Sequence, residues 1–167
     1  MKLSERIICE ELMAHYGLSL PKSPVNTLTL GRPYIYDSSR DPLKDHVLVC
    51  KGLLPEAWEY GSEDDYFILF IPDTDEKAEI DSSKVLELPS STDVWELFNF
   101  IQSVYDKYDA WDESLHHLLQ SEEPLTTLLD ASFPIFGNPL ILRASDYFML
   151  AYSSVIEEKP ELSHLID

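Results

Sequence analysis

The feature that most constrains the fold is a long amphipathic segment, VWELFNFIQSVYDKYDAWDESLHHLL, from Val94 to Leu119. Its apolar residues recur at alternating intervals of three and four residues. This heptad spacing is typical of a helix that packs one narrow stripe against another helix. The stripe consists of Val94, Leu97, Ile101, Val104, Tyr108, Trp111, Leu115 and Leu118. A helix of this length would extend about 40 Å, since each residue adds about 1.5 Å.

The residues around this segment predict where the helix begins and ends. Asp93 is a favourable N-cap, and Glu96 follows it at the capping-box spacing. Pro124 cannot continue a helix interior, because it lacks a backbone N–H. A second, short helix is expected from Leu125 to Ala131.

Two packing partners are possible for the long helix. Phe98, Phe100 and Tyr105 widen the apolar stripe of its first half, as in a helix that packs on the sheet of its own domain. From Asp106 onward the stripe narrows among charged residues, as in a helix that pairs with a second copy of itself. We favour the second interpretation, which predicts a homodimer. Its interface would contain Leu97, Ile101, Val104, Tyr108, Trp111, Leu115 and Leu118.

The residues before this helix predict a small α/β domain with a short mixed sheet. Ser4 to Tyr16 has helical spacing and is followed by Gly17, a natural helix stop. Strands are expected at VNTLTL (25–30), HVLVC (46–50), YFILFI (66–71) and KVLEL (84–88), with a turn at 31–33. The third strand is apolar at every position, so both of its faces should be buried. The fourth alternates and should have one solvent-facing side.

The C-terminal part, Asn138 to Ser154, predicts a β-hairpin with Ser145 and Asp146 at its turn. The faces of the hairpin would carry Leu140, Leu142, Phe148 and Leu150. The fold class expected for the whole chain is α+β. Residues 1–91 would form the N-terminal α/β domain, residues 92–131 a helical, coiled-coil-like connector, and residues 132–167 the hairpin and a tail.

The charge of the chain excludes one class of partner. The 31 acidic residues outnumber the 12 basic residues, and the formal net charge is -19. Such a chain repels a phosphate backbone, so no direct binding of nucleic acid is expected. No apolar run is long enough to span a membrane, and acidic residues interrupt the N-terminal segment where a signal peptide is apolar. We therefore expect a cytoplasmic protein without a membrane partner.

No motif in the sequence predicts a metal site or a cofactor. The acidic segment Asp73–Asp81 lacks the features of an EF-hand, because Ala78 and Lys84 occupy its sixth and twelfth positions. Glu113 and His116 have the spacing found in di-iron bundles, but no second pair exists and both lie off the apolar stripe. Cys9 and Cys50 have no metal or redox spacing and are expected to be buried as small apolar residues.

Catalytic motifs are absent from the sequence as well. It contains no G-x-S-x-G, no P-loop and no G-x-G-x-x-G, and His15, His46 and His164 are scattered. An enzyme is therefore not expected, since a small hydrolase would need a nucleophile and a base. Arg32, Tyr34 and Tyr36 lie near a turn and could line a pocket, although tyrosine in a strand more often serves packing. No ligand-binding residue can be assigned beyond that.

Two segments, LFNFIQSVYDKYDAWDESLHHLL and LLDASFPIFGNPLILRASDYFMLAYSS, carry a resemblance to a known family. From about Asp93 to Ser154 the chain resembles the middle region of bacterial transcription regulators of the purine-catabolism-regulator (PucR-like) type. The resemblance implies an N-terminal sensory region, a helical connector and the first hairpin of a PAS- or GAF-like domain, ahead of a helix-turn-helix. That family often has Thr-Thr-Gly after an N-terminal strand, where this chain has Cys50, Lys51 and Gly52. No family binding residue is therefore carried over.

These observations together predict the ligand-sensing and dimerisation region of a cytoplasmic bacterial transcriptional regulator, without a DNA-binding module of its own. Its partners would be a second copy of the chain and a small-molecule effector. The alternative is a stand-alone acidic module that binds another protein.

Overall fold

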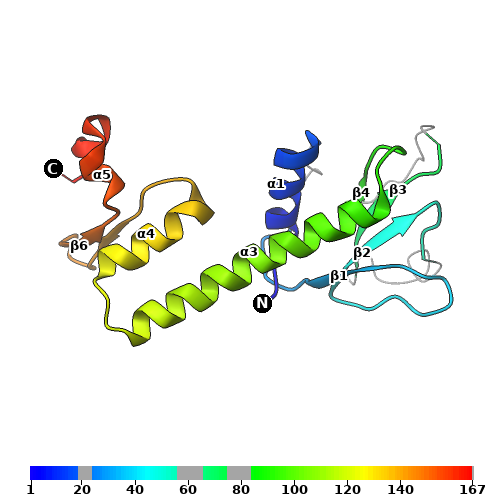
Figure 1. Cartoon of the computed structure of the whole chain (residues 1–167), viewed down its shortest axis with the longest axis horizontal. Coiled ribbons are helices and arrows are strands. Elements are labelled where there is room, and N and C mark those ends of the chain that lie inside the picture. The colour runs from blue at the N-terminus through cyan, green and yellow to red at the C-terminus, as the bar shows by residue number, and fades with distance from the viewer. Residues whose placement is uncertain (19–23, 56–65, 75–83, 167) are drawn as a thin grey trace. The chain divides into compact units, whose positions relative to one another are not determined.

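The computed structural model describes residues 1–18, 24–55, 66–74 and 84–166 (Figure 1). The chain divides into unit 1, residues 1–106, and unit 2, residues 107–167. The boundary lies inside the longest helix, α3 (Val94–Gln120). A parallel four-stranded sheet in unit 1, an antiparallel pair in unit 2 and the helices confirm the α+β class.

Unit 1 is built on a sheet whose strands follow the order of the sequence. The strands are β1 (Gly31–Ile35), β2 (His46–Lys51), β3 (Phe67–Ile71) and β4 (Val85–Glu87). Their order is β1-β2-β3-β4, and each neighbouring pair is parallel. The predicted mixed sheet is therefore wrong, because the sheet is entirely parallel. The carboxyl ends of all four strands consequently lie at the same end of the sheet.

The first strand begins later than the sequence predicts. Val25 to Leu30 was expected to be the strand and Gly31 to Pro33 the turn, but β1 begins at Gly31. Before it, only Leu30 is paired, in an isolated bridge with Leu3. A proline is tolerated in β1 because this strand lies at the edge of the sheet, where an N–H can be missing. The register with β2 also shifts between Gly31 and Tyr34.

Among the described residues of unit 1, helix α1 has the predicted ends and α3 has the predicted start. In α1 (Glu5–Tyr16) the Ser4 hydroxyl accepts the N–H of Ile7, and Gly17 ends the helix with φ 66°. At the start of α3 the carboxylate of Asp93 accepts two backbone N–H groups, those of residues 95 and 96. These capping bonds satisfy backbone donors that a helix terminus leaves without an intrahelical partner.

The core of unit 1 is closed. All five residues of β3 are buried, as the sequence predicts. Tyr105 on α3 is fully buried, and its hydroxyl donates to the backbone oxygens of Leu30 and Gly31 at 3.0 and 2.7 Å. The last strand lacks the predicted solvent-facing side, because Lys84 is buried and forms an ion pair with Glu5, with Nζ 2.6 Å from Oε1.

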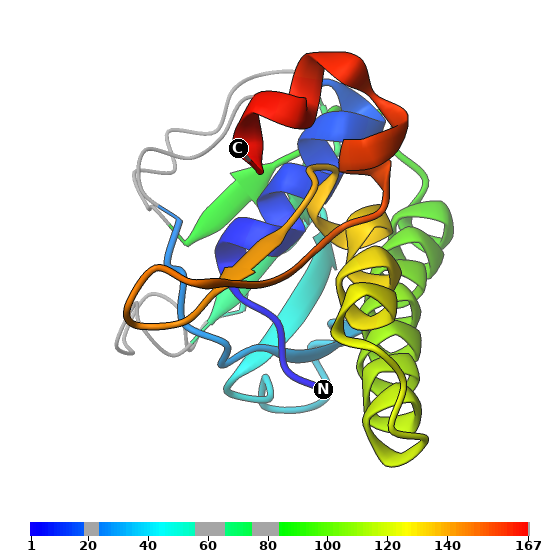
Figure 2. The same cartoon turned by 90° about the vertical axis from the view of Figure 1, so that its left-hand side faces the viewer.

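The described part of unit 2 contains the end of α3, three further helical segments and the predicted hairpin. Helix α4 (Leu125–Phe136) runs five residues past the expected end at Ala131. Pro134 lies in its last turn, where its missing N–H removes one backbone hydrogen bond without ending the helix. Strands β5 (Ile141–Arg143) and β6 (Met149–Tyr152) pair antiparallel and are followed by α5 (Val155–Glu158) and the 3-10 helix η2 (Pro160–Leu165). Figure 2 shows α4 in yellow beside the orange hairpin, which it contacts through β6.

Candidate functional site

The first half of the α3 stripe packs inside unit 1. Leu97 and Ile101 are 0% exposed and Val104 is 2% exposed in the chain by itself. A side chain that its own unit covers completely cannot also contact a second chain. The prediction that these three residues lie in a dimer interface is therefore wrong, and the interpretation of this half as a core helix is correct.

The second half of the stripe lies in unit 2 and is only partly covered. Tyr108, Trp111, Leu115 and Leu118 are half-buried. The indole N–H of Trp111 donates to the Ser132 hydroxyl of α4 at 3.3 Å, and its ring packs edge-on against a phenylalanine of the same helix. The predicted contact with a second chain stays a prediction for these four residues.

Unit 2 carries a large amount of uncovered apolar surface. Among its described residues, Ala151 and Ile156 are the buried apolar ones. In contrast, Tyr147 is 82% and Phe148 is 68% exposed. The apolar surface of unit 2 consists of Leu119, Leu125, Phe136, Leu142, Tyr147, Phe148 and Leu150. Exposed apolar side chains that adjoin one another, as Tyr147 and Phe148 do in sequence, are candidates for contact with another protein.

A second candidate site lies in unit 1, at the end of β1. Two cavities of about 320 and 340 Å³ share Arg40 and Asp41 in their walls. We call them together the carboxyl-edge site. Their other walls are Tyr34, Ile35, Tyr36, Asp37, Ser38, Ser39, Pro42, Leu43, Leu53 and Leu54. These residues follow or end β1 and β2, and the carboxyl ends of parallel strands are where ligands bind in open α/β sheets.

Local hydrogen bonds hold the loop that forms most of this site. The carboxylate of Asp37 accepts the backbone N–H of Ser39 at 3.0 Å and its hydroxyl at 2.8 Å. These two bonds, with a smaller contribution from Arg40, lower the pKa of Asp37. Further along, the N–H of Leu43 donates to the hydroxyl of Tyr34. The loop is thus attached to the sheet at one point and closed by an Asp–Ser turn at another.

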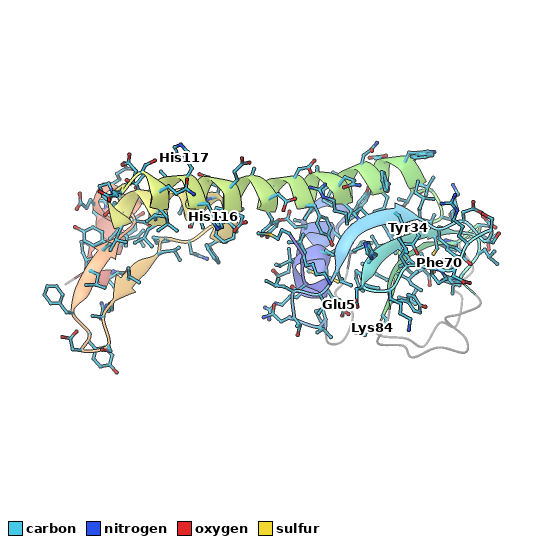
Figure 3. The ribbon with its side chains drawn as sticks, turned by 90° about the horizontal axis from the view of Figure 1, so that it is seen from below. Glu5, Tyr34, Phe70, Lys84, His116 and His117 are labelled. Carbon is cyan, nitrogen blue, oxygen red and sulfur yellow. The ribbon has the colours of Figure 1, made fainter. Side chains whose placement is uncertain are left out.

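The floor of the site belongs to the core of unit 1. Tyr34, Tyr36 and Leu54 pack against buried residues of the sheet, which are Leu48, Cys50, Tyr66, Ile68, Phe70 and Val85. Figure 3 shows Tyr34 and Phe70 close together in this region. Burial raises the pKa of Cys50 to about 12, so its thiol stays protonated and cannot act as a nucleophile at neutral pH. Both cysteines are free and buried, as predicted.

Gly52 lies just beyond β2, at the same end of the sheet as the two cavities. Its φ is 69°, a conformation that favours glycine. The carboxylate of Asp73 lies against it, and a Cβ on Gly52 would be 2.4 Å from Oδ2. The role of Gly52 in this chain is to admit the Asp73 carboxylate.

The sequence identified only part of the carboxyl-edge site. Tyr34 and Tyr36 line it, in agreement with their position near the turn in the sequence. Arg32 instead forms an ion pair with Asp106 at 2.7 Å, so it joins β1 to α3. The charged residues of the loop, Arg40 and Asp41, were not recognised. The sequence pointed to these two residues only through the position of the segment SSRDP, which joins two strands that are parallel in the structure.

The remaining sequence candidates are not brought into a site. His116 is exposed, as predicted for the solvent face of α3, and its Nδ1 lies 2.8 Å from the backbone oxygen of Asp112. Most of the acidic segment 73–81 lies outside the described residues. Within the described ranges, no three His, Cys, Asp or Glu side chains are grouped as metal ligands would be.

Comparison with known proteins gives no relative. No protein family, no curated protein and no solved structure matches the chain. Among the helices of the described residues, none combines the length and the apolarity needed to cross a bilayer.

Proposed function

We propose that this chain is the ligand-sensing and dimerisation region of a cytoplasmic bacterial transcriptional regulator of the PucR-like type. In this proposal, unit 1 binds a small-molecule effector at the carboxyl-edge site. Unit 2 contacts a second copy of the chain. DNA binding would reside in another part of the regulator.

The observation that carries the sensory part is the position of the two cavities. They lie at the carboxyl ends of parallel strands, in a sheet whose strand β3 is fully buried. Their walls combine hydroxyl groups, three charged side chains and apolar side chains, the mixture expected of a small-molecule site.

The apolar surface of unit 2 supports the association part. A two-stranded hairpin is marginally stable in water, and Leu142, Phe148 and Leu150 leave much of this one uncovered. A second copy of the chain would cover such a surface. The same surface also favours the second candidate function, a module that binds a different protein, and the two differ in the partner they require.

The sensory part is tested by thermal unfolding of the whole chain in the presence of fractionated small molecules from a bacterial extract. A ligand that binds only the folded state raises the melting temperature. We expect one or more fractions to do so. The rise should disappear in Asp41→Trp, at a position that lines both cavities, and persist in Ser114→Trp, an exposed α3 position outside both cavities. A rise of equal size in both variants would contradict binding at the carboxyl-edge site.

The choice of partner is tested by light scattering. A dimer of the chain at micromolar concentration agrees with the regulator proposal. A monomer that associates with a second protein agrees with the binding-module alternative.

A further inference from the structure

Two opposite charges in the carboxyl-edge site are free to bind a ligand. Arg40 and Asp41 are adjacent in sequence, and both line both cavities. Neither side chain forms a hydrogen bond or an ion pair in the part of the chain that the structure describes. In contrast, Asp37 of the same loop already accepts two bonds from Ser39. The site therefore offers one available cation and one available anion.

An apolar wall lies beside this pair of charges. The cavity of about 340 Å³ is bounded by Tyr34, Ile35 and Leu43 in addition to the charged residues. Its volume is at the lower end of the range of roughly 300–1,000 Å³ for small-molecule sites. A ligand that fits it is small and has an apolar part next to a polar part.

The net charge of the chain restricts the charge of that ligand. A net charge of -19 repels an anion at long range. A cation is attracted, but it would cover Arg40 without pairing it, and an unpaired charge that loses its water is unfavourable. A zwitterion carries no net charge and satisfies both side chains.

We propose that the carboxyl-edge site binds a free α-amino acid with an apolar side chain. The guanidinium of Arg40 donates to the ligand carboxylate, a pairing that planar geometry favours. The ligand ammonium donates to the carboxylate of Asp41. The ligand side chain packs against Tyr34 and Leu43. This inference rests on the proposed sensory function and specifies the class of its effector.

Three probes that share one branched alkyl group test the inference by calorimetric titration of the whole chain. L-leucine carries both charges, 3-methylbutylamine only the cation and 4-methylpentanoate only the anion. We expect L-leucine to bind and both single-charge probes to bind at least roughly tenfold more weakly. Arg40→Gln and Asp41→Asn should each weaken binding of leucine by a similar factor. Arg6→Gln, at an exposed position of α1, is the control and should leave it unchanged.

Equal binding of 4-methylpentanoate and leucine would overturn the role of Asp41, and equal binding of the amine would overturn that of Arg40. Absence of binding for leucine, valine, methionine and phenylalanine up to about 10 mM would overturn the amino-acid proposal. The sensory function would still stand if an extract fraction stabilised the unmodified chain and not Asp41→Trp. If no fraction did so, the sensory function would fail too.

Discussion

Unit 1 and unit 2 bury their apolar residues to very different degrees. In unit 1, every residue of β3 and the inner face of α3 are covered. Unit 2 buries Ala151 and Ile156 among its described apolar residues and exposes three aromatic side chains by more than half. Large apolar side chains such as Trp95 are exposed on unit 1 as well, but beside a closed core. The difference indicates that unit 1 is stable by its own contacts and that unit 2 needs a further surface to cover it.

The sheets explain this difference in physical terms. A parallel sheet requires cover on both faces, so it forms only where the chain supplies a full core. A two-stranded antiparallel hairpin needs no such cover to form its hydrogen bonds, but it gains little stability from them in water. Four predictions test or sharpen the comparison.

The largest effect is expected at the buried ion pair of unit 1, which Figure 3 shows between Glu5 and Lys84. The two side chains are 7% and 10% exposed, and Glu5 also accepts the N–H of Val25. Glu5→Leu removes the carboxylate that faces a buried ammonium and should lower the free energy of unfolding by about 3–5 kcal/mol. Urea denaturation measures this value.

The control for that substitution is an exposed ion pair on the same helix. Glu10 pairs with Arg6 at 2.8 Å, and both side chains are more than half exposed. Glu10→Leu should change the free energy of unfolding by at most about 0.5 kcal/mol. A loss of similar size at both positions would show that the Glu5–Lys84 pair has no special role in unit 1.

The second prediction compares one substitution in the two units. Leu69 is 0% exposed and Leu150 is 50% exposed. Leu69→Ala should lower the free energy of unfolding by about 2–5 kcal/mol, because it creates a cavity in the core. Leu150→Ala should lower it by less than about 1 kcal/mol in a monomer. A large loss at Leu150 that grows with protein concentration would show that a second chain covers unit 2.

The third prediction concerns the dimer of the proposed function. Leu115→Asp and Tyr108→Asp each place a charge on the half-buried stripe of unit 2, and an unpaired charge in an apolar contact is strongly unfavourable. Light scattering should show half the mass of the unmodified chain. Ser114→Asp adds the same charge at an exposed position and should leave the mass unchanged. A monomeric unmodified chain at micromolar concentration would exclude this arrangement.

The smallest effect is expected from pH in the loop of unit 1. The pKa of Asp37 is lowered in the folded state by its bonds to Ser39 and, less, by Arg40. A lowered pKa means that the stabilisation is complete above the pKa of the unfolded state and disappears as pH falls through the folded value. Unfolding of the chain and of Asp37→Asn should therefore differ near neutral pH and converge in acid. A constant difference at all pH values would rule out this contribution.

How far the sequence predicted the fold depended on how local the signal was. Helix α1, the cap at Asp93 and the uniformly apolar β3 were predicted because neighbouring residues determine them. Strand β1 was not, because its acceptance of Pro33 depends on its position at the edge of the sheet. The buried Lys84 was missed for the same reason, since its partner Glu5 is 79 residues away.

The stripe on α3 shows a second limit of sequence analysis. Heptad spacing indicates that one face of a helix is covered, but it does not indicate by what. Leu97 and Leu115 belong to the same pattern, yet the first lies in the core of unit 1 and the second in half-covered unit 2. The carboxyl-edge site could not be predicted for a similar reason, because Arg40 and Asp41 become part of a site only through the parallel arrangement of β1 and β2.

The hydroxyl of Tyr105 has a consequence for how the protein avoids aggregation. An edge strand can recruit a foreign strand through its free backbone groups. At the start of β1, the oxygens of Leu30 and Gly31 already accept the Tyr105 hydroxyl, and Pro33 has no N–H to donate. The start of this outer strand therefore offers an incoming chain fewer free backbone groups than an ordinary edge strand does, which makes growth of fibres from that point less favourable.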